Sequence, residues 1–147
     1  MIRNQSLTSF IVPYLTFNGN CREAMTFYHA CLGGELVFQT VGDSPLSEKM
    51  PHAMKHVILH SSLHSGNLII MASDMVDEKG LRKGNAVSLM LTCGSEEDLH
   101  RCYYLLSNGG TKDHPPEQTF RGNIFGDLTD KFGNHWLLNC SQTKAII

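Results

Sequence analysis

The stretch FYHACLGG, residues 27–34, recurs in altered form as YYLLSNGG, residues 103–110. Each copy closes a segment whose apolar residues recur at helical spacing, and a glycine pair is a common helix stop. Two such stops can coincide by chance, but the order of predicted elements around them repeats as well. We therefore interpret the chain as an internal duplication. With a constant offset of 76 residues, the aligned pairs are Phe27 with Tyr103, Tyr28 with Tyr104, Gly33 with Gly109, and Gly34 with Gly110.

Each half reads as a strand, a helix and then strands that end in a hairpin. Asn20 is a suitable N-cap for the first helix, and Glu23 three residues later completes a pattern related to the capping box. HSGN, residues 64–67, lies between two apolar, β-branched runs and predicts a hairpin turn. Further predictions are strands at 10–17, 35–41 and 86–93, a turn-rich loop at 42–51, a helix within 95–110, at most a short edge strand in the proline-rich 111–120, and a second hairpin at 123–141 that turns near 131–134.

The length and composition predict one domain over residues 1–147. We place its two modules at about 8–74 and 85–141, joined by a charged linker at 75–84. The hydrophobic content of 41% and the charged content of 18% are ordinary for a globular protein. The predicted fold class is α+β, with two βαβββ modules.

Charge and cysteine usage exclude several classes of function. The formal net charge is -2 with no basic stripe, so we expect no nucleic-acid partner. No apolar run reaches the ~18–20 residues that a membrane span needs, so we expect no membrane association. The first 17 residues lack the apolar core of a signal peptide. The five cysteines form no C-x-x-C pair, which predicts reduced thiols and a cytoplasmic protein.

Four histidines, His52, His56, His60 and His64, recur at every fourth position. On a helix, neighbours at this spacing can share one zinc ion, but on a strand they stand ~13 Å apart. The hairpin signal favours a strand, so these four histidines do not form a single metal site. We expect one strand face to carry His56, Ile58, His60, Ser62 and His64, with His56 and His64 solvated. His60 is either a hydrogen-bonded, buried imidazole or a polar group that projects into a ligand cavity.

Three stretches resemble the vicinal oxygen chelate superfamily of glyoxalases, extradiol dioxygenases and bleomycin-resistance proteins, and within it the PhnB-like group. They are PYLTFNGNCREAMTFYHACLGGEL at 13–36, LIIMASD at 68–74 and FGDLTDKFGNHWLLN at 125–139. His60 also stands where that group tends to have a histidine. The resemblance covers nearly the whole chain and implies two half-barrels that enclose a cavity, usually in a homodimer.

The resemblance also locates the metal ligands of the superfamily on this sequence. They fall on Pro13, near Met71, near Val87 or Ser88, and on Leu137. None of these is a His, Glu or Gln, and none is a useful ligand for a divalent ion. We therefore expect no metal and no cofactor.

Other motifs add little chemistry. Residues 130–133 predict a turn with Gly133 at positive φ, and Asp74 is more often a turn residue than a base. Trp136 is either core filler or a wall of the cavity, and it points opposite to Leu137 on a strand. No nucleophile elbow occurs, and GNC and LGGEL lack the strand–loop–helix setting of a nucleotide site, which counts against an adenosylmethionine-dependent methyltransferase.

The predicted function is that of a PhnB-like, metal-free protein that binds a small-molecule ligand. The predicted ligand-binding residues are Tyr14, Phe17, His60 and Trp136. The alternative is a lyase-, isomerase- or dioxygenase-like enzyme of the same superfamily. Such an enzyme would use His60 as a general acid or base, or an atypical metal site.

Overall fold

A computed structural model describes residues 8–119 and 122–141 of the chain. Residues 1–7, on which the prediction about a signal peptide partly depends, lie outside the described residues, as does Phe120 of the proline-rich segment. No helix within the described ranges is long and apolar enough to cross a membrane.

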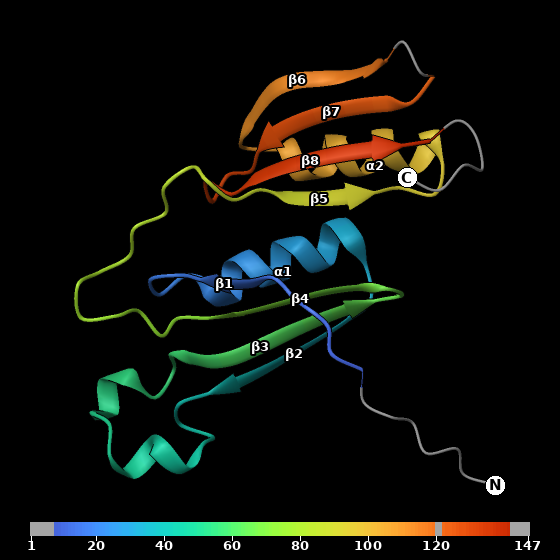
Figure 1. Cartoon of the computed structure of the whole chain (residues 1–147). Coiled ribbons are helices and arrows are strands. Elements are labelled where there is room, and N and C mark those ends of the chain that lie inside the picture. Colours follow the sequence, from blue (N-terminus) through green and yellow to red (C-terminus); the bar gives the residue numbers. More distant parts are fainter. Residues whose placement is uncertain (1–7, 120–121, 142–147) are drawn as a thin grey trace, which may run out of the picture.

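The chain forms two four-stranded sheets, each covered on one face by a helix (Figure 1). This arrangement confirms the predicted α+β class with paired half-barrels. The exact module boundaries, 8–74 and 85–141, stay a prediction. The elements of the first half are β1 (Tyr14–Thr16), α1 (Cys21–Leu32), β2 (Glu35–Thr40), β3 (Ile58–Ser65) and β4 (Leu68–Ser73), and those of the second are β5 (Leu89–Thr92), α2 (Glu96–Ser107), β6 (Thr111–Gln118), β7 (Ile124–Thr129) and β8 (His135–Cys140).

The two sheets have the same topology. The strand order is β1-β4-β3-β2 in one sheet and β5-β8-β7-β6 in the other. In each sheet a first strand pairs in parallel with the last strand of its hairpin, and all other pairs are antiparallel. Both predicted hairpins are present, as β3–β4 and β7–β8.

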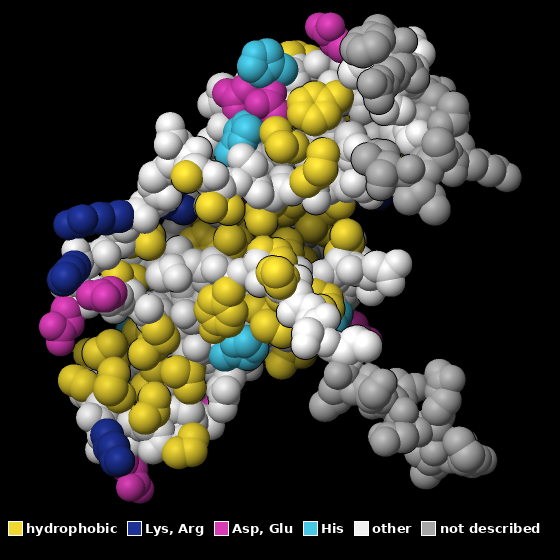
Figure 2. Space-filling model, viewed as in Figure 1, with side chains coloured by type: hydrophobic (Ala, Val, Ile, Leu, Met, Phe, Trp, Pro, Cys, Tyr) yellow, Lys and Arg dark blue, Asp and Glu magenta, His cyan; other side chains and the backbone are white. Residues whose placement is uncertain are grey.

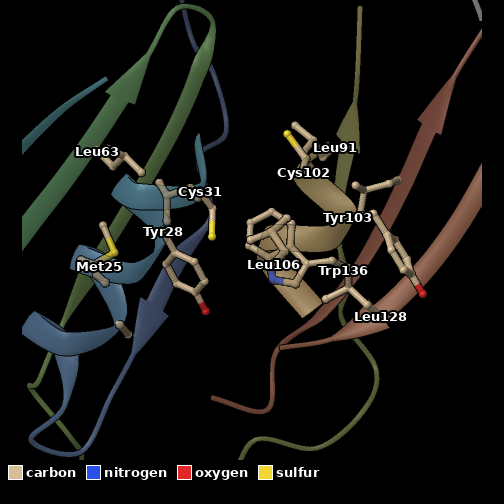
Figure 3. Packing of buried hydrophobic residues seen from close by; sticks show 14 of the residues in the cluster. Met25, Tyr28, Cys31, Leu63, Leu91, Cys102, Tyr103, Leu106, Leu128 and Trp136 are labelled. Carbon is tan, nitrogen blue, oxygen red and sulfur yellow. The ribbon is translucent and has the colours of Figure 1, made fainter. Parts of the chain in front are cut away.

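The hydrophobic core joins the two halves. Tyr28 of α1 packs on Trp136 of β8, with ring centroids 5.6 Å apart, and on Phe132 of the β7–β8 turn. Its hydroxyl donates to the buried carboxylate of Asp130 at 2.5 Å, and Asn134 donates to the same hydroxyl at 2.8 Å. Burial raises the pKa of Tyr28, so the phenol stays protonated and donates. Figure 3 shows Tyr28 and Trp136 at this junction.

Burial corrects the predicted alignment of the two helices. Tyr28 is 0% exposed, whereas Tyr104, its predicted counterpart, is 69% exposed. The counterpart by burial is Tyr103, which is 5% exposed, so the helices align with an offset of 75 and not 76. The offset of 76 does hold for Gly34 and Gly110, because one extra residue separates α2 from its glycines. A Cβ at either glycine would lie 2.1 Å from a carbonyl oxygen of the adjacent hairpin.

The two helices are capped differently. Asn20 stands at the N-cap of α1, but its side chain makes no capping hydrogen bond. Asp74 instead accepts from the backbone N–H groups of Gly19 and Cys21, both at 2.9 Å, and its other oxygen accepts from Ile58 N–H at 3.1 Å. Asp74 therefore ties the end of the first hairpin to the start of α1. In α2 the cap is local, since Ser95 accepts from Asp98 N–H at 3.1 Å.

Two local predictions require correction. The proline-rich segment forms an eight-residue edge strand, β6, which is longer than predicted because two register shifts accommodate its prolines. Residues 42–51 include a short 3₁₀ helix, Pro45–Glu48, which Ser44 caps.

The predicted histidine face is also partly wrong. A register shift at Gln39 and Thr40 turns Ile58 into the core, where it is 1% exposed, and His56 precedes the strand. His60, Ser62 and His64 remain together on the opposite face. The turn prediction is confirmed, with Gly133 at φ +88°.

Candidate functional site

One face of each sheet packs on its helix, and the other, here called the open face, does not. A row of directly paired residues crosses each open face. In the first sheet the row is Tyr14, Met71, Ser62 and Val37. In the second sheet it is Met90, Leu137, Asp127 and His114.

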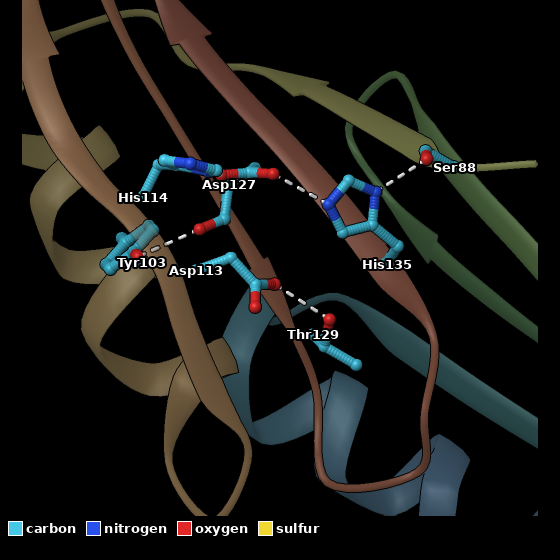
Figure 4. Close-up of polar contacts among 7 residues, drawn as sticks. All are labelled: Ser88, Tyr103, Asp113, His114, Asp127, Thr129 and His135. Atoms are coloured by element: carbon cyan, nitrogen blue, oxygen red, sulfur yellow. Dashed lines mark hydrogen bonds and ion pairs between the residues drawn. The ribbon is translucent and has the colours of Figure 1, made fainter. Parts of the chain in front are cut away.

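The open face of the second sheet carries a polar network centred on Asp127 of β7 (Figure 4). One carboxylate oxygen lies 2.7 Å from His114 Nδ1, and the other lies 2.8 Å from His135 Nε2. His135 Nδ1 lies 2.6 Å from the hydroxyl of Ser88. Three adjacent strands and the segment before β5 therefore contribute to a single network.

The hydrogen bonds of the network favour the charged form of its central carboxyl. Desolvation opposes ionisation of Asp127, but the hydrogen bonds from His135 and His114 outweigh it and lower the pKa of this carboxyl. An ionised Asp127 accepts the Nε2–H of His135, so a neutral His135 presents Nδ1 as an acceptor to Ser88. In the other tautomer the Nδ1–H of His135 donates to the Ser88 hydroxyl, and Nε2 offers its lone pair to a proton or a metal ion.

A second carboxylate, Asp113 of β6, lies beside this network. Its Oδ2 accepts from the hydroxyl of Thr129 at 2.8 Å. Single donor atoms of Asp113, Asp127 and His135 all lie within 4.8 Å of one another. Behind them, the hydroxyl of Tyr103 donates to the backbone carbonyl of Asp127 at 2.9 Å and braces β7 from the helix side.

A cavity of about 610 Å³ adjoins the network. It lies between β1, residues 81–85, the start of β5 and the β7–β8 turn, and both Thr129 and His135 line it. A second, more apolar cavity of about 570 Å³ lies between residues 10–13, β4 and β5. Figure 2 shows apolar side chains along the hollow between the sheets, with histidine and acidic side chains gathered over the second sheet.

The structure separates the four predicted ligand-binding residues. Tyr14 and His60 meet on the open face of the first sheet, where the Tyr14 hydroxyl lies 3.0 Å from His60 Nδ1. Tyr14 lines the 610 Å³ cavity, whereas His60 lines neither cavity. Phe17 is buried in the core, and Trp136 is 3% exposed and reaches only the second cavity. The indole of Trp136 donates to Asp130 at 2.9 Å, so its polar group is satisfied inside the core.

Of the positions onto which the resemblance places the superfamily ligands, Pro13 and Ser88 precede β1 and β5, whereas Met71 and Leu137 lie within β4 and β8. Met71 and Leu137 occupy equivalent points of the two open-face rows, paired with Tyr14 and Met90. Among these mapped positions, Ser88 is the one whose side chain joins the polar network, because its hydroxyl contacts His135.

Sequence reasoning missed the network itself. His135 and Asp127 flank the predicted turn at 131–134, and Thr129 pairs with His135. Residues 127, 129 and 135 therefore share one face of a hairpin that was predicted correctly. That alternation was the available signal, whereas no local pattern placed Asp113 and His114 beside them.

Residues 9–139 match the sequence model of a family described as 3-demethylubiquinone-9 3-methyltransferase. The chain belongs to this family. It is 32% identical over 136 residues to the protein YjdN of Escherichia coli K12, covering 86% of this chain and 92% of YjdN. Its fold matches the crystal structure of protein PA1353 from Pseudomonas aeruginosa with 39% identity and a TM-score of 0.79, covering 92% of this chain and 100% of the other.

Two further solved structures share the fold. A Bacillus cereus protein described as a putative 3-demethylubiquinone-9 3-methyltransferase, PhnB protein, is 25% identical with a TM-score of 0.70, covering 90% of this chain and 100% of the other. A glyoxalase/bleomycin resistance protein/dioxygenase family enzyme from Burkholderia phytofirmans shares the fold at 16% identity and a TM-score of 0.58, covering 86% and 95% of the two chains. The PhnB-like resemblance therefore holds, and the chain shares the fold of glyoxalase/bleomycin resistance/dioxygenase proteins.

The family description names a methyltransferase, but the start of α1 does not form a nucleotide-binding site of the kind that an adenosylmethionine-dependent enzyme would use. The segment GNC does lie between a strand and a helix, contrary to the prediction, because β1 and α1 flank it. However, the helix N-terminus, where a phosphate would bind, already holds the carboxylate of Asp74.

Proposed function

We propose that the protein binds a small organic anion in the 610 Å³ cavity. The observation that carries this proposal is the charge of the cavity wall. Arg82 and Lys83 line it, while its described lining residues include no Asp or Glu. The volume lies within the ~300–1,000 Å³ typical of ligand sites.

The position of Lys83 supports an anion site. Its ammonium group donates to the side-chain oxygen of Asn134 at 3.0 Å and lies 5.7 Å from the centroid of the Phe17 ring. These contacts hold the linker against the β7–β8 turn and keep a cation at the wall. Leu81, Val87 and Leu89 line the same cavity. The favoured ligand therefore combines an acidic group with an apolar body.

Paired fluorescent probes test the proposal. Anilinonaphthalene sulfonate carries a negative charge, whereas N-phenyl-1-naphthylamine has a similar ring system without one. Because a hydrogen bond to a charged group contributes ~1.5–3 kcal/mol, we expect Arg82→Ala with Lys83→Met to weaken sulfonate binding at least about tenfold. Binding of the neutral probe should change little.

Arg101→Ala is the matched control, because Arg101 is an exposed cation on α2 that pairs with Asp98. It should leave both probes unaffected, and circular dichroism should show the same fold in every variant. Sulfonate binding that survives the loss of both Arg82 and Lys83 would contradict the proposal.

We further propose that the protein is a cytoplasmic homodimer. Phe10, Ile11, Val87 and Met90 expose apolar side chains beside the second cavity, and a second copy would cover them. All five cysteines are free, which supports a reducing compartment. Sedimentation analysis should give a dimer that Ile11→Asp dissociates, and a monomeric wild type would remove this part of the proposal.

A further inference from the structure

Three donor residues converge on the open face of the second sheet. Asp113, Asp127 and His135 come from β6, β7 and β8, three neighbouring strands whose backbones hold them in place (Figure 4). We propose that these three side chains bind a divalent transition-metal ion, with zinc as the best match.

The donor chemistry supports a borderline metal. One imidazole nitrogen and two carboxylate oxygens are ligands that zinc accepts at ~2.0–2.2 Å. Donors around a tetrahedral zinc ion at these distances are ~3.3–3.6 Å apart, so a set already within 4.8 Å must close by about 1 Å. Rotation of the exposed Asp113 side chain can supply this movement.

Neighbouring groups already orient the ligands. In the tautomer that donates Nδ1–H to the Ser88 hydroxyl, the Nε2 of His135 is unprotonated and faces the carboxylates as a metal donor. The hydroxyl of Thr129 holds one oxygen of Asp113. Such hydrogen bonds to ligands are a regular feature of protein metal sites.

The adjoining cavity is an independent reason to expect a ligand here. His135 and Thr129 belong both to the cluster and to the wall of the 610 Å³ cavity. Three protein ligands leave a coordination position for water or for a cavity-bound anion. The site lies outside the four superfamily positions, whose side chains led to the expectation of no metal.

The experiment uses full-length protein without a histidine tag, stripped of metal and titrated with zinc alone in a calorimeter. We expect one zinc ion per chain, and at least about tenfold weaker binding in Asp113→Asn and His135→Gln. Asp113 is exposed, so its variant should fold normally. Cobalt added in place of zinc should give visible absorption bands that both variants lose.

His60→Gln is the control, because His60 lies on the open face of the first sheet, and it should bind zinc like the wild type. Absence of stoichiometric binding in the wild type would overturn the proposal. Binding that persists unchanged in both ligand variants would overturn it too, since it would come from other surface histidines. Arg82→Ala with Lys83→Met should retain zinc, so this test and the anion test fail independently.

Discussion

The open faces of the two sheets occupy equivalent positions but carry different chemistry. Strand pairing places Ser62 and Val37 of the first sheet where the second has Asp127 and His114. Ile69 stands opposite His64 in the first hairpin, as His135 stands opposite Thr129 in the second. The linked carboxylate and imidazoles thus have apolar or hydroxyl counterparts in the first half.

The helix-covered faces, by contrast, are alike. Both glycines after the helices approach a hairpin carbonyl, and both helices bury a tyrosine at the same turn. Packing against a helix restricts what a position accepts, whereas the open face tolerates a polar cluster in one copy only. The two halves therefore share the packing of the core, whereas the polar cluster of Asp113, Asp127 and His135 is present in the second half.

The largest effect is expected at the equivalent glycines. Gly34→Ala and Gly110→Ala each drive a Cβ to 2.1 Å from a carbonyl oxygen, so both variants should fail to fold or lose more than ~4 kcal/mol. Gly66→Ala is the control, because Gly66 has positive φ in open space and should cost only ~1–2 kcal/mol. Soluble yield shows whether each variant folds, and urea unfolding measures its loss of free energy of unfolding. A stable variant at either Gly34 or Gly110 would break the equivalence of the two helix ends.

A smaller loss of stability is expected on removing the helix caps, and it should be larger for α1 than for α2. Asp74→Ala removes three charged hydrogen bonds from two elements and should cost ~3 kcal/mol. Ser95→Ala removes one local cap and should cost ~1 kcal/mol. Urea unfolding of both variants gives the difference. Equal losses would show that the long-range cap of α1 adds nothing over a local one.

The smallest effect is expected at the two buried tyrosines. Tyr28→Phe removes a donor to the buried Asp130 and an acceptor for Asn134, and should cost ~2 kcal/mol. Tyr103→Phe frees one backbone carbonyl and should cost ~1 kcal/mol. Thermal unfolding tests this order, and a larger loss for Tyr103→Phe would reverse our view of which tyrosine joins the two halves.

The sequence predicted the elements that depend on local signals. The helix stops at Gly33 and Gly109, the turn before Gly133 and the β3–β4 hairpin all have a signature within a few residues. It failed where a distant residue replaced a local one, as Asp74 does for Asn20 at the start of α1.

The candidate site was missed for a related reason. Its residues lie on three strands, and their approach depends on the pairing of β6 with β7, which no local pattern specifies. His60 was singled out by its place between apolar residues in a predicted strand, which is visible in a sequence, whereas convergence across a sheet is not. Tyr14 beside His60 was the one predicted pair that the fold brings together.

The irregular strand β6 is a poor edge for pairing with a strand of another chain. It forms the outer border of the second sheet, and its Pro115 and Pro116 have no N–H to offer an incoming chain. Two register shifts further disturb the pattern that a foreign strand would need to match. The prolines thus discourage polymerisation along this border, even though the strand carries Asp113 and His114 to the surface.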